Sequence, residues 1–153
     1  MQIFALALAV ALAQALEEEK QEAATSLIRD NEGYGIYDAA ASTLSMSDCT
    51  IQDTVATGSG DGSGLYLRGS LDSWSNNTIT GNEGYPLLLP ADEVVELDDS
   101  STMTGNGEDA IWLTSYAVNT SGTWSDPGVP YVVGYGYLNV YGSSAIPVEL
   151  VVD

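Results

Sequence analysis

The chain has 153 residues, a length that suits one domain with a sizeable core. Its 3 Lys and Arg residues against 22 Asp and Glu residues give a formal net charge of −19 at pH 7. A charge this negative argues against nucleic acid and anionic membranes as partners, because both are bound through Lys and Arg. Histidine is absent and Cys49 is the single cysteine, which excludes the usual structural zinc sites and the Ser-His-Asp and Cys-His nucleophile systems. The 16 Gly and 9 Tyr residues against a single Phe favour strands and turns over helices.

The N-terminal segment is apolar. Residues 3–13 carry no charge, and a run of acidic residues begins at 17. The apolar stretch at 3–13 is too short to span a membrane, which takes about 20 residues. The sequence Ala13-Gln14-Ala15 has the small-x-small form that signal peptidase cleaves. We expect residues 1–15 to be a signal peptide, followed by an acidic linker at 16–25, and the protein to be secreted or on the cell surface. The alternative is an apolar helix that caps the domain.

A repeat follows this segment. Each of four units carries a central apolar residue that is followed, three places later, by Asn or Thr. The centres are 23, 28 and 24 residues apart, and the middle interval becomes 22 once the six-residue Gly- and Ser-rich insertion at 58–63 is removed. Repetition at this period is typical of a solenoid, in which like residues of successive coils lie over one another. We expect an inward core column of Ile28, Ile51, Ile79 and Met103, and a turn column of Asn31, Thr54, Asn82 and Asn106.

Each unit reads as about three short strands separated by Gly, Asn and Asp. The second strand is centred eight places after the first, at Ile36, Leu87 and Ile111, and its counterpart beyond the insertion is Leu65. The third strand includes apolar residues such as Val95 and Leu97. Residues 26–122 are therefore expected to form an all-β solenoid with about 22–24 residues per coil.

The turns Asp30-Asn31, Gly81-Asn82 and Gly105-Asn106 each follow a short strand. They resemble the turns of right-handed parallel β-helix repeat proteins, the pectate-lyase-like superfamily, over about residues 25–115. The resemblance implies a right-handed parallel β-helix. It implies no single reaction, because that fold includes lyases, hydrolases, adhesins and passive stalks.

The pattern changes after the fourth unit. Residues 124–130 form a turn-rich connector, and apolar strands follow at 131–133, 137–141 and 146–152. We expect residues 123–153 to hold the connector and the start of a further β module. The last strand has no polar cap, which favours end-to-end contact with further solenoid coils.

The strongest candidate site lies nine places after each centre, next to the inward residues of the second strand. Because strand side chains alternate, Tyr37, Tyr66 and Trp112 are expected to point outward in one column, with Leu88 between them. Flat aromatic faces with polar tips suit sugar rings, and we expect this column to contact a polysaccharide or a surface glycan. The alternative is an aromatic column that only packs beneath a loop.

Metal and catalytic sites are weaker predictions. Asp61, Asp98 and Asp99 supply the oxygen ligands that calcium prefers, but a solvated acidic face explains them as well, so no cofactor is expected and calcium is the alternative. We expect a non-catalytic module for adhesion or carbohydrate contact. The alternative is a fragment of a polysaccharide lyase or glycoside hydrolase, with its active residues outside the chain or among Asp30, Asp53 and Asp98.

Overall fold

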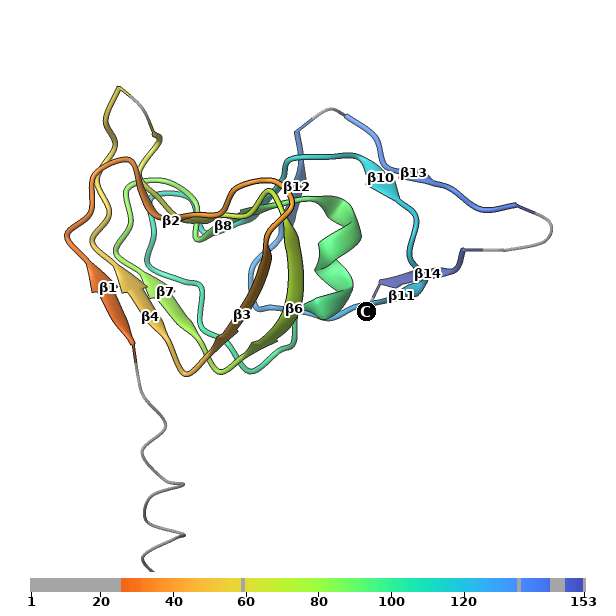
Figure 1. Ribbon diagram of the computed structural model, residues 1–153, viewed down its shortest axis with the longest axis horizontal. Coiled ribbons are helices and arrows are strands. Elements are labelled where there is room, and N and C mark those ends of the chain that lie inside the picture. Colours follow the sequence, from red (N-terminus) through yellow and green to blue (C-terminus); the bar gives the residue numbers. More distant parts are fainter. Residues whose placement is uncertain (1–25, 59, 135, 144–147, 153) are drawn as a thin grey trace, which may run out of the picture.

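The computed structural model describes residues 26–58, 60–134, 136–143 and 148–152. The strands in this part of the chain pair in parallel and stack into a solenoid of about four turns (Figure 1). The predicted all-β parallel solenoid is thus confirmed. The predicted signal peptide or helical cap at 1–15 and the linker at 16–25 lie outside the described residues. No helix in the described ranges is long and apolar enough to cross a membrane.

Each of the first coils has three sides, and each side belongs to a different sheet. The first side is a three-stranded sheet of β1 (Leu27–Arg29), β4 (Thr50–Gln52) and β7 (Thr78–Thr80). The second side is a five-stranded sheet in the order β12-β9-β8-β5-β2, with β2 (Tyr34–Tyr37), β5 (Ser63–Tyr66), β8 (Leu87–Leu89), β9 (Ile111–Leu113) and β12 (Tyr131–Val133). The third side pairs β3 (Thr43–Ser47) with β6 (Ser70–Ser75).

The inner column of the first side supplies the centre of the core. Ile28 pairs with Ile51, and Ile51 pairs with Ile79, in one unbroken register. Met103 follows in the next coil, where Thr102 forms a bridge with Thr78. Ile51 and Ile79 are fully buried and Met103 is 1% exposed, whereas Ile28 in the first coil is half-buried. Burying a side chain of this size stabilises the fold by about 1.5–3 kcal/mol.

The turn after the first side has a left-handed residue in each of the four repeat units. Asp30, Asp53, Gly81 and Gly105 occupy equivalent positions, with φ values of 56°, 57°, 69° and 84°. Glycine adopts this conformation without a steric penalty, and Asp is one of the few other residues that tolerate it. The Asp-Asn and Gly-Asn pairs of the sequence are therefore one structural motif, in which the first residue turns the chain and the second links the coils.

The linking residues hydrogen-bond from coil to coil. Oδ1 of Asn82 accepts the backbone N–H of Thr54 at 3.1 Å, and Oδ1 of Asn106 accepts the backbone N–H of Asn82 at 3.2 Å. The side-chain amide of Asn106 also donates to the carbonyl of Ile79 at 3.0 Å. Asn31 lies at the end of this column, and its buried side-chain N–H group has no partner among the described residues.

The insertion leaves the coil path intact. Its first part is a tight turn in which Thr57 and Gly60 exchange backbone hydrogen bonds at 2.9 and 3.2 Å. The N–H of Gly62 then donates to the carbonyl of Gly33 in the preceding coil at 2.9 Å. The second side resumes at once, with Leu65 paired to Ile36.

The third side departs from the sequence prediction in the third coil. The strand expected to carry Val95 and Leu97 is replaced by the 3₁₀ helix η1 (Ala91–Glu96), which lies beside β6 (Figure 1). Ala91, Val94 and Leu97 are buried at a spacing of three residues, which is the 3₁₀ period. The prediction of a strand was wrong here because buried residues three apart satisfy the core equally well from a 3₁₀ helix.

The solenoid continues through the C-terminal part of the chain. Here β10 (Ala117–Val118) pairs with β13 (Asn139–Val140), and β11 (Gly122–Trp124) pairs with β14 (Leu150–Val152), both in parallel. The described residues after 122, where the sequence analysis expected a connector and the start of a further module, also provide β12, which extends the five-stranded sheet. Val140, Val151 and Val152 are exposed on these last strands.

Candidate functional site: an aromatic strip on the five-stranded sheet

The second side presents a column of outward residues. The register pairs Tyr37 with Tyr66, Tyr66 with Leu88, and Leu88 with Trp112. Leu65, Leu87 and Ile111, which precede three of them, are buried in the core, and Ile36, which precedes Tyr37, is partly buried against it. Because side chains alternate along a strand, the structure brings Tyr37, Tyr66 and Trp112 onto one outer surface.

Two further tyrosines, missed in the sequence analysis, join this column. Tyr34 lies 5.4 Å from Tyr66 and 5.7 Å from Tyr37 between ring centroids, and Tyr85 lies 5.4 Å from Trp112. Both tyrosines come six places after a unit centre, so the repeat spacing would have placed them together. We call the set of Tyr34, Tyr37, Tyr66, Tyr85 and Trp112 the aromatic strip.

The aromatic strip has two parts, separated by the nearly buried Leu88. One part is the tyrosine trio, in which Tyr37 and Tyr66 meet edge to face at 90°. The other is the Tyr85–Trp112 pair, whose rings are tilted by 47°. With strands about 4.8 Å apart, Tyr66 and Trp112 are two strand spacings, or roughly 10 Å, from each other. This separation is on the scale of a disaccharide.

The exposure of the strip is uneven. The side chain of Tyr37 is 51% exposed, and the other four residues are half-buried. The indole of Trp112 lies against the backbone at Gly134, where an added Cβ would come within 2.3 Å of its six-membered ring. The backbone at Gly134, just after the neighbouring strand β12, therefore packs against the indole and restricts its orientation.

Arg68 lies at the carboxyl end of the strip, two residues after Tyr66. Its Nη1 donates to the hydroxyl of Tyr37 at 2.7 Å, and its guanidinium carbon is 6.0 Å from the centre of the same ring. The hydrogen bond to Tyr37 raises the pKa of Arg68, a side chain that is a cation in proteins in any case. The other described cation, Arg29, is paired with Asp30 at 3.5 Å on a different side of the coil.

The opposite end of the strip is acidic. Asp61 precedes β5 and Glu108 precedes β9, so in a parallel sheet both lie at the amino ends of the strands. Burial raises the pKa of Tyr34, and the charge of Asp61 raises it further. The pKa of Tyr85 is raised in the same way, by burial and then by Glu108 and Asp61. We call Asp61 and Glu108 the acidic margin; beside it the two phenols stay neutral.

The candidate calcium ligands are used within their own turns. Asp61 accepts the backbone N–H of Ser63 at 3.1 Å, and Asp98 accepts both the N–H and the hydroxyl of Ser100 at 3.1 and 2.7 Å. Asp99 is exposed beside Asp98. In the part of the chain that the structure describes, no three acidic or cysteine residues are grouped so as to hold a metal ion.

The acidic residues considered for catalysis are not brought together. Asp30 and Asp53 occupy the left-handed turn after the first side, where Asp53 accepts the amide of Gln52 at 2.8 Å. Asp98 follows η1 at the end of the third side, at a different corner of the coil. The three carboxylates therefore cannot act on one bond.

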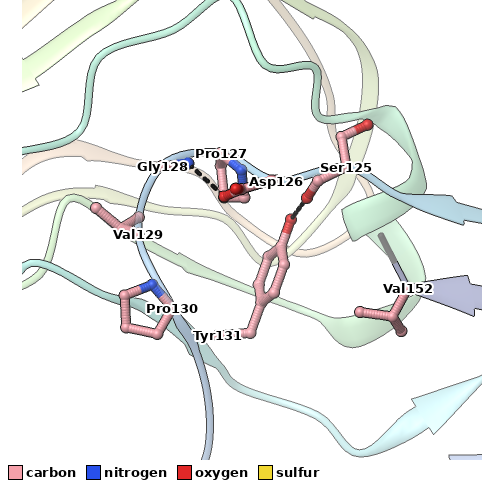
Figure 2. Close-up of a pocket in the computed structure, with 8 residues that line it drawn as sticks. All are labelled: Ser125, Asp126, Pro127, Gly128, Val129, Pro130, Tyr131 and Val152. Atoms are coloured by element: carbon pink, nitrogen blue, oxygen red, sulfur yellow. Dashed lines mark hydrogen bonds between the residues drawn. The ribbon is translucent and has the colours of Figure 1, made fainter.

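A cavity of about 420 Å³ lies away from the strip, between the turn at 125–131 and Val152 (Figure 2). The hydroxyl of Tyr131 donates to the carbonyl of Ser125 at 2.8 Å, and Asp126 accepts the N–H of Gly128 at 2.9 Å. Burial, with a smaller effect of Asp126, raises the pKa of Tyr131 to about 12. The Tyr131 hydroxyl and the Asp126 carboxylate are thus engaged within the turn itself, and the cavity lining contains a single aromatic ring, so the aromatic strip is the better candidate.

No protein-family model, curated protein or solved structure matches the chain.

Proposed function

We propose that this chain is an exported, non-catalytic β-solenoid module that contacts carbohydrate through the aromatic strip. The observation that carries the proposal is the register of Tyr37, Tyr66 and Trp112 on the outer surface of the second side. Tyr34 and Tyr85 widen this surface, and Arg68 and the acidic margin add hydrogen-bonding groups at its two ends. Aromatic faces with polar groups around them are suited to the apolar faces and hydroxyls of sugar rings.

Further parts of the proposal concern the fold and the setting. We assign the solenoid to the right-handed, pectate-lyase-like type on the strength of its Asp-Asn and Gly-Asn turns. We assign it to the cell surface or the extracellular medium on the strength of the predicted signal peptide, and calcium stays an optional ligand of its acidic turns. The exposed apolar residues of the last strands suit end-to-end contact with further coils.

The proposal is tested by retention on insoluble cellulose and chitin. The variant Tyr37→Ala/Tyr66→Ala/Trp112→Ala removes the three predicted contacts, and Tyr116→Ala/Tyr137→Ala/Tyr141→Ala removes three exposed tyrosines outside the strip. We expect the first variant to lose retention and the second to keep it. Tyr37→Ala alone, at a half-exposed position, checks that the loss does not come from unfolding.

Two results would overturn the proposal. Equal retention of the strip variant and the intact protein would mean that the aromatic strip is only packing. Release of reducing or unsaturated sugar by the intact protein would favour the lyase or hydrolase alternative instead.

A further inference from the structure

We propose that the aromatic strip selects polysaccharides that carry protonated amino sugars. This inference rests on the proposed carbohydrate contact and adds the chemical class of the ligand. Its basis is the placement of Asp61 and Glu108 beside Tyr34 and Tyr85, within a chain of formal net charge −19. The N–H of Gly62, next to Asp61, donates to the carbonyl of Gly33, next to Tyr34, at 2.9 Å. The N–H of Glu108 donates to the carbonyl of Gly84, next to Tyr85, at 3.2 Å.

The geometry of the parallel sheet gives the strip two different ends. Asp61 and Glu108 come just before β5 and β9, whereas Arg68 comes just after β5. Because all strands of this sheet run the same way, carboxylates lie at one end of the strip and the guanidinium at the other. A polysaccharide that covers the strip can therefore meet carboxylates at one end and a hydrogen-bond donor at the other.

An ammonium group fits the acidic end on two counts. Cations are attracted to the faces of aromatic rings, and the phenols of Tyr34 and Tyr85 supply such faces. Carboxylates within the same surface add charge-assisted hydrogen bonds, which are stronger than neutral ones. Asp61 and Glu108 are both exposed and thus accessible to a ligand.

The opposite end is already organised around its own cation. Arg68 is held on Tyr37 by the 2.7 Å hydrogen bond, which leaves its other N–H groups to donate to hydroxyl oxygens of a sugar. An acidic polysaccharide would gain this contact but would meet the acidic margin and the field of the whole chain. The balance of charges therefore favours an amino sugar over a uronic acid.

The test compares chitin with its deacetylated form, chitosan, because the two polymers share a backbone and differ in the free amine. Retention is measured at a pH at which the amines are protonated and the carboxylates ionised. We expect the intact protein to prefer chitosan. The variant Asp61→Asn/Glu108→Gln should weaken chitosan binding about three- to tenfold, as for two exposed ion pairs, and should weaken chitin binding less, because chitin offers no charged amine to these carboxylates.

A matched control separates local recognition from general attraction between a polyanion and a polycation. Glu96→Gln/Asp99→Asn makes the same change in net charge at exposed positions in and after η1. We expect it to bind chitosan like the intact protein. An equal loss in both double variants would overturn the inference.

The experiment also distinguishes failure of the inference from failure of the proposed function. Equal binding of chitin and chitosan, lost in Tyr37→Ala/Tyr66→Ala/Trp112→Ala, would overturn only the choice of amino sugars. Binding that the aromatic variant leaves unchanged would overturn both.

Discussion

Asn82 is the residue on which the coil-to-coil turn column depends most. It is 2% exposed, and its Oδ1 is the acceptor for the backbone N–H of Thr54, a fully buried residue. Its side-chain amide donates to Oδ1 of Asn106 at 2.9 Å and approaches the carbonyl of Ile51 at 3.4 Å. The substitution Asn82→Ala removes these contacts in the middle of the solenoid without changing the net charge.

The expected cost follows from the groups left behind. A buried N–H without an acceptor costs about 1–3 kcal/mol, and a lost side-chain hydrogen bond about 0.5–1.5 kcal/mol. We therefore expect Asn82→Ala to lower the free energy of unfolding by roughly 2–4 kcal/mol. That is a large part of the about 5–15 kcal/mol by which a typical domain is stable.

The same substitution at the end of the column is the control. The side-chain N–H group of Asn31 has no partner among the described residues, so Asn31→Ala should change stability by less than about 0.5 kcal/mol. Urea unfolding followed by both circular dichroism and tryptophan fluorescence measures the two variants. Equal destabilisation of both, or none in Asn82→Ala, would refute the argument that the column stabilises through inter-coil hydrogen bonds.

Two further predictions concern packing and pH. Gly64→Ala should lower the free energy of unfolding by about 1–3 kcal/mol, because the new Cβ would lie 2.5 Å from Cγ2 of Ile79 and 2.8 Å from the carbonyl oxygen of Pro86. In the control variant Gly58→Ala, the new Cβ meets no atom within 4 Å. Equal melting temperatures of the two variants would contradict this packing. Burial alone would raise the pKa of Asp92, but the N–H groups of Asn119 and Thr120 outweigh it and hold the pKa below its usual 3.8. The stability due to this carboxylate is thus present above pH 3.8 and lost as the pH falls towards the lower pKa of the folded state. The melting temperature of Asp92→Asn should therefore fall less on acidification than that of the intact protein. Parallel curves of melting temperature against pH for the two proteins would contradict this.

The sequence was most informative where the coils are regular. The apolar centres predicted a parallel solenoid because inward residues of stacked coils must recur at the coil length. The six-residue offset at Leu65 also follows from this rule, since the insertion closes on itself between Thr57 and Gly60 and returns the chain to the same path. The regular spacing therefore predicts that Ile36 pairs with Leu65 and Tyr37 with Tyr66, as the structure shows.

It was least informative at turns and in the last coils. Strict alternation from Ile36 and Tyr37 would place Tyr34 on the inward face with Ile36, but its ring packs on both Tyr37 and Tyr66. The hydrogen bond from Arg68 to Tyr37 joins residues 31 positions apart, and the repeat spacing alone does not predict it. After Trp112 the sequence contains no further Gly-Asn turn, so no motif predicts the pairing of β12, β13 and β14.

A ligand that binds the aromatic strip must contact Trp112, whose fluorescence therefore reports on binding directly. Trp74 and Trp124 are 4% and 2% exposed, whereas Trp112 is half-buried on the strip, so a ligand that lies on the strip should change the emission of Trp112 above all. The measurement is a fluorescence titration with a soluble glucosamine oligomer, on the intact protein and on Trp112→Phe. We predict a saturable change in emission that disappears in Trp112→Phe. An unchanged emission while the protein is retained on chitosan, or the same change in both proteins, would contradict the claim.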